Sequence, residues 1–172
     1  MSKNTKEALV AAFLELVGQS ELDKVTVTDI VEKCQISRQT FYYHFDDINS
    51  MLIWAFDSEI KRICINQNPD FMEKAEKGFV EFFNKYDVMF RKSLKSHKLI
   101  FIFNLINKCF YDYIVSYISV KRNEEQNPGK NADYVISYTA GAFTALIIKT
   151  IQSEKSDYET IVNNLSSSLQ GI

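Results

Sequence analysis

The sequence predicts an all-α protein with two helical domains, the first built from three helices. Two observations support this prediction. The 172 residues include only 5 Gly and 2 Pro, and alternating runs of β-branched residues are scarce. Apolar residues instead recur at spacings of three and four along much of the chain, which is typical of amphipathic helices. The elements are justified below in chain order.

The N-terminal region predicts three helices in residues 1–47. Apolar residues at positions i, i+3, i+4, i+7 and i+8 predict a first helix from about Thr5 to Gln19. Thr26, followed three residues later by Asp29, has the form of a capping box that opens a short second helix. Ser37 is a second N-cap, and it opens a short third helix from Arg38 to about His44. Two short helices that are separated by a three-residue turn and follow a longer helix predict a helix-turn-helix domain.

Residues 48–172 predict a second, all-helical domain. Asp46 and Asp47 suit the N-terminus of a long helix that connects the two domains. Loops between helices are expected at 66–70, which contains Pro69, and at 121–131, where Pro128 and Gly129 form a turn. The predicted helices cover residues 48–65, a segment with the aromatic face of 79–90, and residues 99–120, 132–153 and 158–169.

Composition and charge exclude several classes of protein. Hydrophobic residues are 46% and charged residues 24% of the chain, which is ordinary for a globular protein. No uninterrupted apolar stretch approaches the ~20 residues that span a bilayer, and the N-terminus lacks the layout of a signal peptide. We therefore expect no membrane segment and a cytoplasmic location. A net charge of −2 argues against nucleic-acid binding by bulk charge, so any such binding needs a local surface.

The chain shows no pattern expected of an enzyme or a metal protein. Cys34, Cys64 and Cys109 are far apart and odd in number, so we expect buried free thiols rather than disulfides or a zinc site. There is no nucleophile–base pair, no metal-ligand spacing and no Gly-rich phosphate loop. We expect no catalytic residues, no metal and no cofactor.

The third predicted helix carries side chains suited to a DNA groove. In a helix-turn-helix, the first residues of the second short helix meet base edges in the major groove. Arg38 can bind guanine O6 and N7, and Gln39 can bind adenine N6 and N7. Thr28, early in the preceding helix, can reach a base or a phosphate. Hydroxyl and imidazole groups one turn further along can bind phosphate oxygens, and these belong to Thr40, Tyr42, Tyr43 and His44.

The stretch VTVTDIVEKCQISRQTFYYHF, residues 25–45, resembles the helix-turn-helix of the TetR family of bacterial transcriptional regulators. The resemblance is strong over roughly the first 60 residues. It implies a dimer whose all-helical second domain senses a ligand and whose last two helices form a four-helix bundle with the partner. A narrower resemblance to the dihydroxyacetone-kinase operon regulators of the family implies a response to a partner protein. Carried over by position, base contacts map to Thr28, Arg38 and Gln39, and phosphate contacts to Thr26, Thr40, Tyr42, Tyr43 and His44.

Three features depart from the family pattern. Gln35 stands where the family usually has Gly, because the turn favours a left-handed residue; a side chain there costs about 1 kcal/mol. Asp46 and Asp47 stand near the start of the fourth helix, where a Lys often meets a phosphate. Residues 1–62 hold 7 Lys and Arg against 10 Asp and Glu. We therefore expect weak non-specific affinity for DNA.

The resemblance also gives a predicted dimer interface in the last two helices. Small residues at near-helical spacing in the seventh predicted helix allow close approach of another helix, either from the partner or from the same chain. The aromatic residues of the second domain are expected to form its core more often than a ligand pocket. The interface residues that we predict are Tyr138, Gly141, Ala142, Ala145, Ile148, Ile161 and Leu165.

These observations predict a sequence-specific regulator that binds a palindromic operator in double-stranded DNA as a homodimer. The first expectation is a repressor that responds to an unidentified small-molecule effector or partner protein. One alternative is an activator that depends on a coregulator, as in the dihydroxyacetone-kinase regulators. A second alternative, suggested by the acidic N-terminal region, is a helical protein-interaction module that does not bind DNA.

Overall fold

The computed structural model describes residues 2–64, 71–122 and 129–170, and the regular elements in these ranges are helices. The predicted all-α fold class is therefore confirmed. The elements are α1 (Ser2–Gln19), the 3-10 helix η1 (Leu22–Lys24), α2 (Val27–Lys33), α3 (Arg38–His44), α4 (Ile48–Cys64), α5 (Phe71–Ser93), α6 (Leu99–Arg122), α7 (Gly129–Gln152) and α8 (Tyr158–Gln170).

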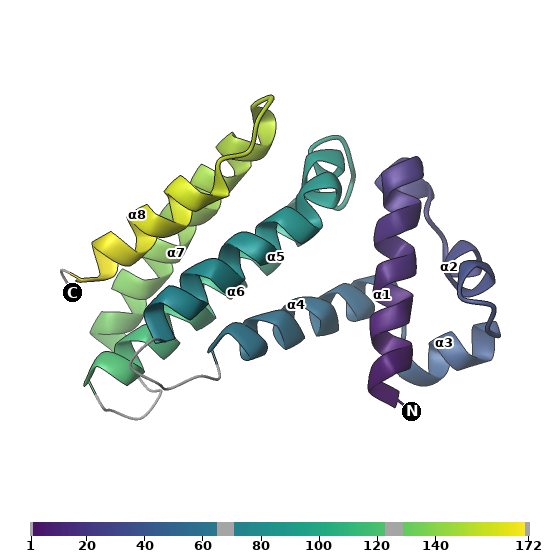
Figure 1. Ribbon diagram of the computed structural model, residues 1–172, viewed down its shortest axis with the longest axis horizontal. Coiled ribbons are helices and arrows are strands. Elements are labelled where there is room, and N and C mark those ends of the chain that lie inside the picture. Colours follow the sequence, from purple (N-terminus) through teal and green to yellow (C-terminus); the bar gives the residue numbers. More distant parts are fainter. Residues whose placement is uncertain (1, 65–70, 123–128, 171–172) are drawn as a thin grey trace.

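The helices form two groups that α4 connects. In Figure 1, α2 and α3 lie on one side of α1, and α4 runs from this group to the inclined helices α5, α6, α7 and α8. Leu9 and Phe13 of α1, Ile30 of α2, and Phe41 and Phe45 around the end of α3 are buried together in the small N-terminal core. Burial of these apolar side chains fixes the position of the two short helices against α1.

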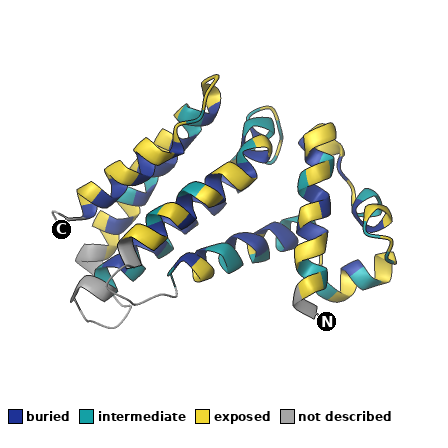
Figure 2. Ribbon diagram, in the orientation of Figure 1, coloured by how far each residue is buried: buried dark blue, intermediate teal, exposed yellow. Residues whose placement is uncertain are grey.

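Aromatic side chains dominate the core of the larger group. Phe79 of α5 lies 4.7 Å from Tyr113 of α6 and 5.9 Å from Phe110, measured between ring centroids. Phe56 of α4 lies 5.1 Å from Phe82 of α5. These rings are fully or almost fully buried, and Figure 2 shows buried residues along the facing sides of the helices. Three helices are thus held by one continuous set of ring contacts.

Lys92 of α5 anchors the C-terminal end of α1. Its ammonium group donates to the backbone carbonyls of Val17 (2.6 Å), Gly18 (3.1 Å) and Ser20 (2.8 Å). The last carbonyls of a helix lack partners within the helix, and a cation there also interacts favourably with the helix dipole. Asp23 of η1 adds a second link, because it accepts a hydrogen bond from the Ser96 hydroxyl (2.6 Å). The N-terminal helices are therefore tied to the end of α5.

A polar network attaches the start of α8 to α5. Asp87 accepts hydrogen bonds from Arg91 Nε (2.9 Å), the Ser156 hydroxyl (2.7 Å) and the Tyr158 hydroxyl (2.5 Å). Arg91 also donates to the Ser153 carbonyl (2.6 Å). Burial alone would raise the pKa of Asp87, but the hydrogen bonds from Tyr158, Ser156 and Arg91 outweigh it and lower that pKa. Asp87 is therefore ionised near neutral pH.

The observed helices differ from the predicted ones mainly at their ends. α1 begins at Ser2 rather than Thr5, and the described part of α4 covers the predicted helix from Ile48 to Cys64. α6 continues to Arg122 and α7 begins at Gly129, so residues 121–122 and 129–131, which were predicted as loop, are helical. Helix ends are set by a few local bonds, which hydrophobic spacing does not report. The predicted break at 66–70 and Pro128 lie outside the described residues.

Two of the predicted interface residues are buried within the single subunit. Ile161 and Leu165 are 7% and 1% exposed, because the apolar stripe of α8 packs against α5 and α7. The α7 residues differ: Tyr138, Ala142 and Ala145 are exposed, and Gly141 and Ile148 are half-buried. The surface that α7 presents is therefore the part of the predicted interface that remains accessible in one chain.

α6 and α7 are rich in apolar residues because they pack against other helices in the core. By length and composition alone, Leu99–Ser119 and Asp133–Gln152 are long and apolar enough to cross a membrane. In the structure α6 and α7 lie side by side, with Ile106, Phe110 and Ile147 fully buried. Buried core helices of globular proteins have this composition.

The packing also shows the surroundings of Asn107 and of the cysteines. Asn107 of α6 is half-buried and donates a hydrogen bond to the Thr144 hydroxyl of α7 (3.4 Å), so it contacts a neighbouring helix. Among the cysteines, all of them free thiols, only Cys109 is buried; Cys34 and Cys64 are half-buried, contrary to the expectation of fully buried thiols. Cys34 follows the last residue of α2 and Cys64 is the last described residue of α4, and both are packed partly against the core.

Candidate nucleic-acid interface

A left-handed residue closes the turn between α2 and α3. Gln35 has φ 54°, in the region that favours glycine. Its N–H donates to the Glu32 carbonyl (3.1 Å), and the Ile36 N–H donates to the Val31 carbonyl (3.0 Å). This pair of bonds is the Schellman pattern at a helix C-terminus. The prediction that Gln35 occupies a left-handed position is confirmed.

Both short helices begin at the predicted caps. Thr26 and Asp29 form a reciprocal capping box, in which the Asp29 N–H donates to the Thr26 hydroxyl (3.3 Å) and the Thr26 N–H donates to Asp29 Oδ2 (2.8 Å). Hydrogen bonds from the side chain and backbone of Thr26 lower the pKa of Asp29. At α3, the Thr40 N–H donates to the Ser37 hydroxyl (3.1 Å). The caps fix where each helix starts, and so which side chains lie at its first positions.

Arg38 and Gln39 occupy the first two positions of α3 and are exposed. The inner face of the helix is fixed by Phe41, which is fully buried, and by Phe45, which is 5% exposed. Within the described residues, neither Arg38 nor Gln39 makes a side-chain hydrogen bond. Both side chains are therefore available to a ligand at the helix N-terminus.

The other predicted contact residues lie around the same helix. Tyr42 and Tyr43 are 49% and 83% exposed, and the ring of Tyr43 lies 5.0 Å from that of His44, edge to face. His44 is half-buried, as are Thr28 in α2 and Thr40 in α3. Thr26 is exposed, but its hydroxyl is already held in the capping box, where it donates to Asp29 (2.7 Å). These side chains thus lie on, or directly before, α2 and α3, and the two helices pack against each other.

Lys6 is a candidate contact that sequence reasoning missed. Its ammonium lies 5.0 Å from the ring centroid of Phe45 and 5.2 Å from that of Trp54. A shallow depression joins it to Tyr42 and Tyr43. Lys6 therefore adds a positive charge beside the exposed tyrosines. No local signal in the sequence links residue 6 to residues 45 and 54, because the three meet only through the packing of α1 against α3 and α4.

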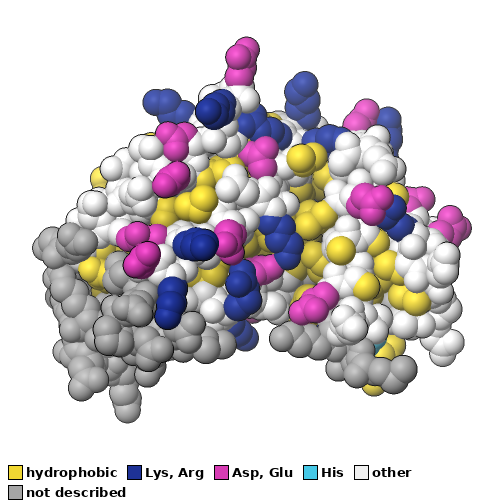
Figure 3. All heavy atoms as spheres, in the orientation of Figure 1, with side chains coloured by type: hydrophobic (Ala, Val, Ile, Leu, Met, Phe, Trp, Pro, Cys, Tyr) yellow, Lys and Arg dark blue, Asp and Glu magenta, His cyan; other side chains and the backbone are white. Residues whose placement is uncertain are grey.

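The acidic start of α4 has a structural role. The Ser50 N–H donates to Asp47 Oδ1 (2.7 Å), and the Asp47 N–H donates to the Ser50 hydroxyl (3.1 Å), so Asp47 caps the helix. Asp46 beside it is exposed. Figure 3 shows acidic and basic side chains interspersed over one face of the molecule. Next to the end of α3, the start of α4 thus presents the exposed carboxylates Asp46 and Asp47 rather than a cation.

Two short, capped helices joined by a tight turn, with exposed Arg and Gln side chains at the start of the second, form a helix-turn-helix. In this unit the second helix enters the major groove of duplex DNA. With the all-helical domain attached through α4, the fold defines the chain as a DNA-binding transcriptional regulator.

A family model matches the helix-turn-helix. Residues 9–53 match the model described as "Bacterial regulatory proteins, tetR family". The helix-turn-helix of this chain is therefore of the TetR type, as the sequence predicted, and that type is found in transcriptional regulators rather than enzymes.

Two similar proteins extend the match over the whole chain. The HTH-type dhaKLM operon transcriptional activator DhaS of Lactococcus lactis subsp. lactis (strain IL1403) is 23% identical to this chain over an alignment of 172 residues. The alignment covers 94% of this chain and 88% of that protein. A solved structure named dihydroxyacetone kinase operon activator DhaS aligns with a TM-score of 0.75 at 19% identity, covering 99% of this chain and 96% of the other. The narrower resemblance predicted from the sequence is thus confirmed, and the structural likeness shows a shared fold.

Proposed function

We propose that the chain is a homodimeric regulator that reads a palindromic operator with two copies of α3. The observation that carries this proposal is the exposure of Arg38 and Gln39 at the capped start of α3, where neither side chain makes a hydrogen bond to the described residues. Arg binds guanine and Gln binds adenine through paired hydrogen bonds in the major groove. Tyr42 and Tyr43, one turn further on, supply hydroxyls for phosphate oxygens and so set the register. Thr26, Thr28, Thr40 and His44 complete the proposed contact set.

The outer surface of α7 supports the proposed dimer. Tyr134, Val135, Tyr138 and Leu146 are 77%, 50%, 80% and 42% exposed, a concentration of large apolar side chains on one helix. Ala142 and Ala145 lie on the same face and allow close approach of a second helix. The outward face of α8 is polar instead, with Asn163, Asn164, Ser167 and Ser168 exposed. We therefore centre the proposed interface on α7.

We propose activation as the direction of regulation. The sequence first suggested a repressor, but the full-length relative is named as an activator, of the dhaKLM operon in its own organism. The filled aromatic core of α4, α5 and α6 supports a signal that is received outside the centre of this bundle, such as a partner protein on its surface. Such a signal acts by favouring one spacing of the two α3 helices over another. We expect this to take place in the cytoplasm.

Selection of binding sites from random duplex DNA tests the proposal. We expect an enriched palindrome whose half-sites lie about one helical turn, ~34–36 Å, apart. An absence of any enriched palindrome would support the alternative of an interaction module without DNA binding. A promoter carrying the selected site, measured with and without the chain, then separates activation from repression by the sign of the change in transcription.

A further inference from the structure

A lysine of α1 supplies a cation beside the acidic start of α4. Lys6 lines a shallow depression together with Tyr42 and Tyr43, the two exposed tyrosines of α3. Asp46, just before α4, borders the same depression. We propose that the Lys6 ammonium binds a phosphate of the operator backbone at the C-terminal end of α3. This inference rests on the proposed function, because it adds a backbone contact to the same DNA-reading surface.

Two aromatic rings hold the Lys6 ammonium in place. The nitrogen lies 5.0 Å from the ring centroid of Phe45 and 5.2 Å from that of Trp54, and both distances are within cation–π range. The two rings also pack on each other, with centroids 5.7 Å apart. Phe45 is buried and Trp54 is half-buried, so the core fixes both rings. Lys6 is therefore positioned before DNA arrives, and it loses less freedom on binding than a mobile surface lysine would.

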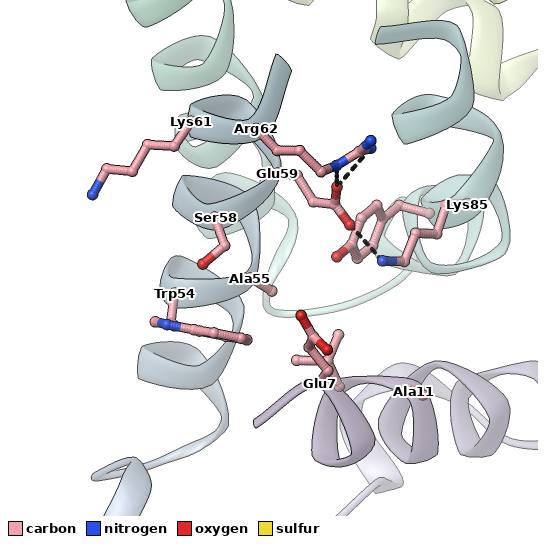
Figure 4. Close-up of a pocket in the computed structure, with 11 residues that line it drawn as sticks. Glu7, Ala11, Trp54, Ala55, Ser58, Glu59, Lys61, Arg62 and Lys85 are labelled. Atoms are coloured by element: carbon pink, nitrogen blue, oxygen red, sulfur yellow. Dashed lines mark hydrogen bonds and ion pairs between the residues drawn. The ribbon is translucent and has the colours of Figure 1, made fainter. Parts of the chain in front are cut away.

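The positive charge of Lys6 is not neutralised within the described part of the chain. Its side chain makes no ion pair or hydrogen bond with the described residues, and the rings that hold it carry no net charge. Glu7, the next residue of α1, lies instead with Trp54 in the cleft between α1 and α4–α5 (Figure 4). Trp54 lines both hollows, whereas Glu7 lines the cleft and Lys6 lines the depression. The two charges of α1 are thus directed to different hollows.

Asp46 limits what the depression can bind. It is the one carboxylate among the lining residues, and it is exposed, so its charge offsets part of that of Lys6. The depression is also shallow, and a free anion there would stay largely hydrated. A backbone phosphate differs, because a duplex already docked on α3 presents it at high local concentration. The geometry therefore favours one phosphate of bound DNA over an independent anion site.

The depression lies where the DNA backbone is expected to pass. With Arg38 at the leading end of α3 in the major groove, the last turn of that helix lies at the edge of the groove. Tyr42 and Tyr43 belong to this last turn, and their hydroxyls are the proposed phosphate ligands. Lys6 borders the same depression, so it reaches the same stretch of backbone from α1.

Operator affinity measured over a series of salt concentrations tests this contact. Each phosphate neutralised by a cation adds about 0.9 to the slope of log affinity against log salt. Lys6→Met keeps the apolar stem on the rings and removes the charge, so the slope should become shallower by about one. The advantage of wild type over Lys6→Met should fall about threefold between ~50 and ~200 mM salt. The loss should be equal on operator and random duplex, because a phosphate contact does not read sequence.

Two further variants serve as controls. Lys6→Arg keeps both the charge and the cation–π contact, so it should restore the slope that Lys6→Met loses. Lys155→Met removes an equal charge from the exposed link between α7 and α8, which Figure 1 shows away from α1, α2 and α3. It should leave the slope unchanged. A wild-type slope in Lys6→Met, or an equal change in Lys155→Met, would overturn the proposal.

Amine labelling of the unaltered full-length protein gives an answer that does not depend on any variant. Reductive methylation followed by mass spectrometry should be slower at Lys6 when operator DNA is bound, and it should be unchanged at Lys155. Equal labelling of Lys6 with and without DNA would also overturn the proposal.

The same measurements separate this inference from the proposed function. A wild-type chain that binds no duplex at any salt concentration removes the proposed function and the Lys6 contact with it. A chain that selects an operator, while Lys6→Met keeps the wild-type salt slope, removes the Lys6 contact alone.

Discussion

Lys92→Met tests how the DNA-reading helices are held to the second domain. The substitution keeps the apolar stem and removes an ammonium that donates to three carbonyls at the end of α1, at 2.6, 3.1 and 2.8 Å. A hydrogen bond to a charged group contributes about 1.5–3 kcal/mol when desolvated, and a cation at a helix C-terminus about 0.3–1 kcal/mol. Lys92 is only half-buried, so water replaces part of this interaction in the variant. We expect a loss of about 2–3 kcal/mol in the free energy of unfolding.

Urea unfolding at fixed protein concentration measures this loss, since a dimer's stability depends on concentration. Lys95→Met is the matched control, because Lys95 lies three residues further on, is exposed and makes no side-chain hydrogen bond to the described residues. The control should change stability by less than about 0.5 kcal/mol. If the two variants are equally stable within that margin, the three carbonyl contacts of Lys92 do not anchor α1 and the reasoning fails.

Four further predictions follow from the structure. Arg38→Ala should cost about 1–3 kcal/mol of operator affinity and relax specificity at one base pair per half-site; an equal loss on all sequences would identify a phosphate contact. Gln35→Gly should raise stability by about 0.5–1 kcal/mol, because it relieves a left-handed backbone; no gain in the urea midpoint would contradict this. Tyr138→Glu should produce monomers in sedimentation, while Val88→Glu, at an exposed site on α5, should not. Because the folded pKa of Asp87 is lowered, its stabilisation is complete above the ordinary value of 3.8 and is lost as the pH falls through the lowered value. Urea midpoints of Asp87→Asn and wild type should therefore converge in acid, and a constant difference would exclude this role.

Local signals made the helix-turn-helix predictable. The caps at Thr26 and Ser37 depend on residues three positions apart, and the structure shows both. The left-handed turn at Gln35 was expected from the resemblance, because the family usually has Gly at this position, and the structure shows it. Each of these features is decided within one turn of helix, so the sequence contains the whole cause.

Contacts between distant residues were not predictable in this way. Lys92 looks like one more lysine in a basic stretch, and only the packing of α5 on α1 brings it to Val17. Ile161 and Leu165 have the spacing of an apolar helix face, but spacing does not say whether that face meets its own chain or a partner. Tyr86 likewise reads as part of an aromatic stripe, and its spacing does not show that its buried hydroxyl has no hydrogen-bond partner among the described residues.

The carboxylate caps that begin α2 and α4 have a consequence for how the protein is distributed in the cell. Helix starts built on Asp29 and Asp47 put negative charge in the part of the molecule that approaches DNA. Non-specific DNA competes with the operator for a regulator, mainly through the charge of its phosphates. A genome offers ~10⁶ or more of these non-specific binding sites. A regulator that those sites hold weakly keeps a larger share of its copies unbound, so few molecules suffice to fill a specific site.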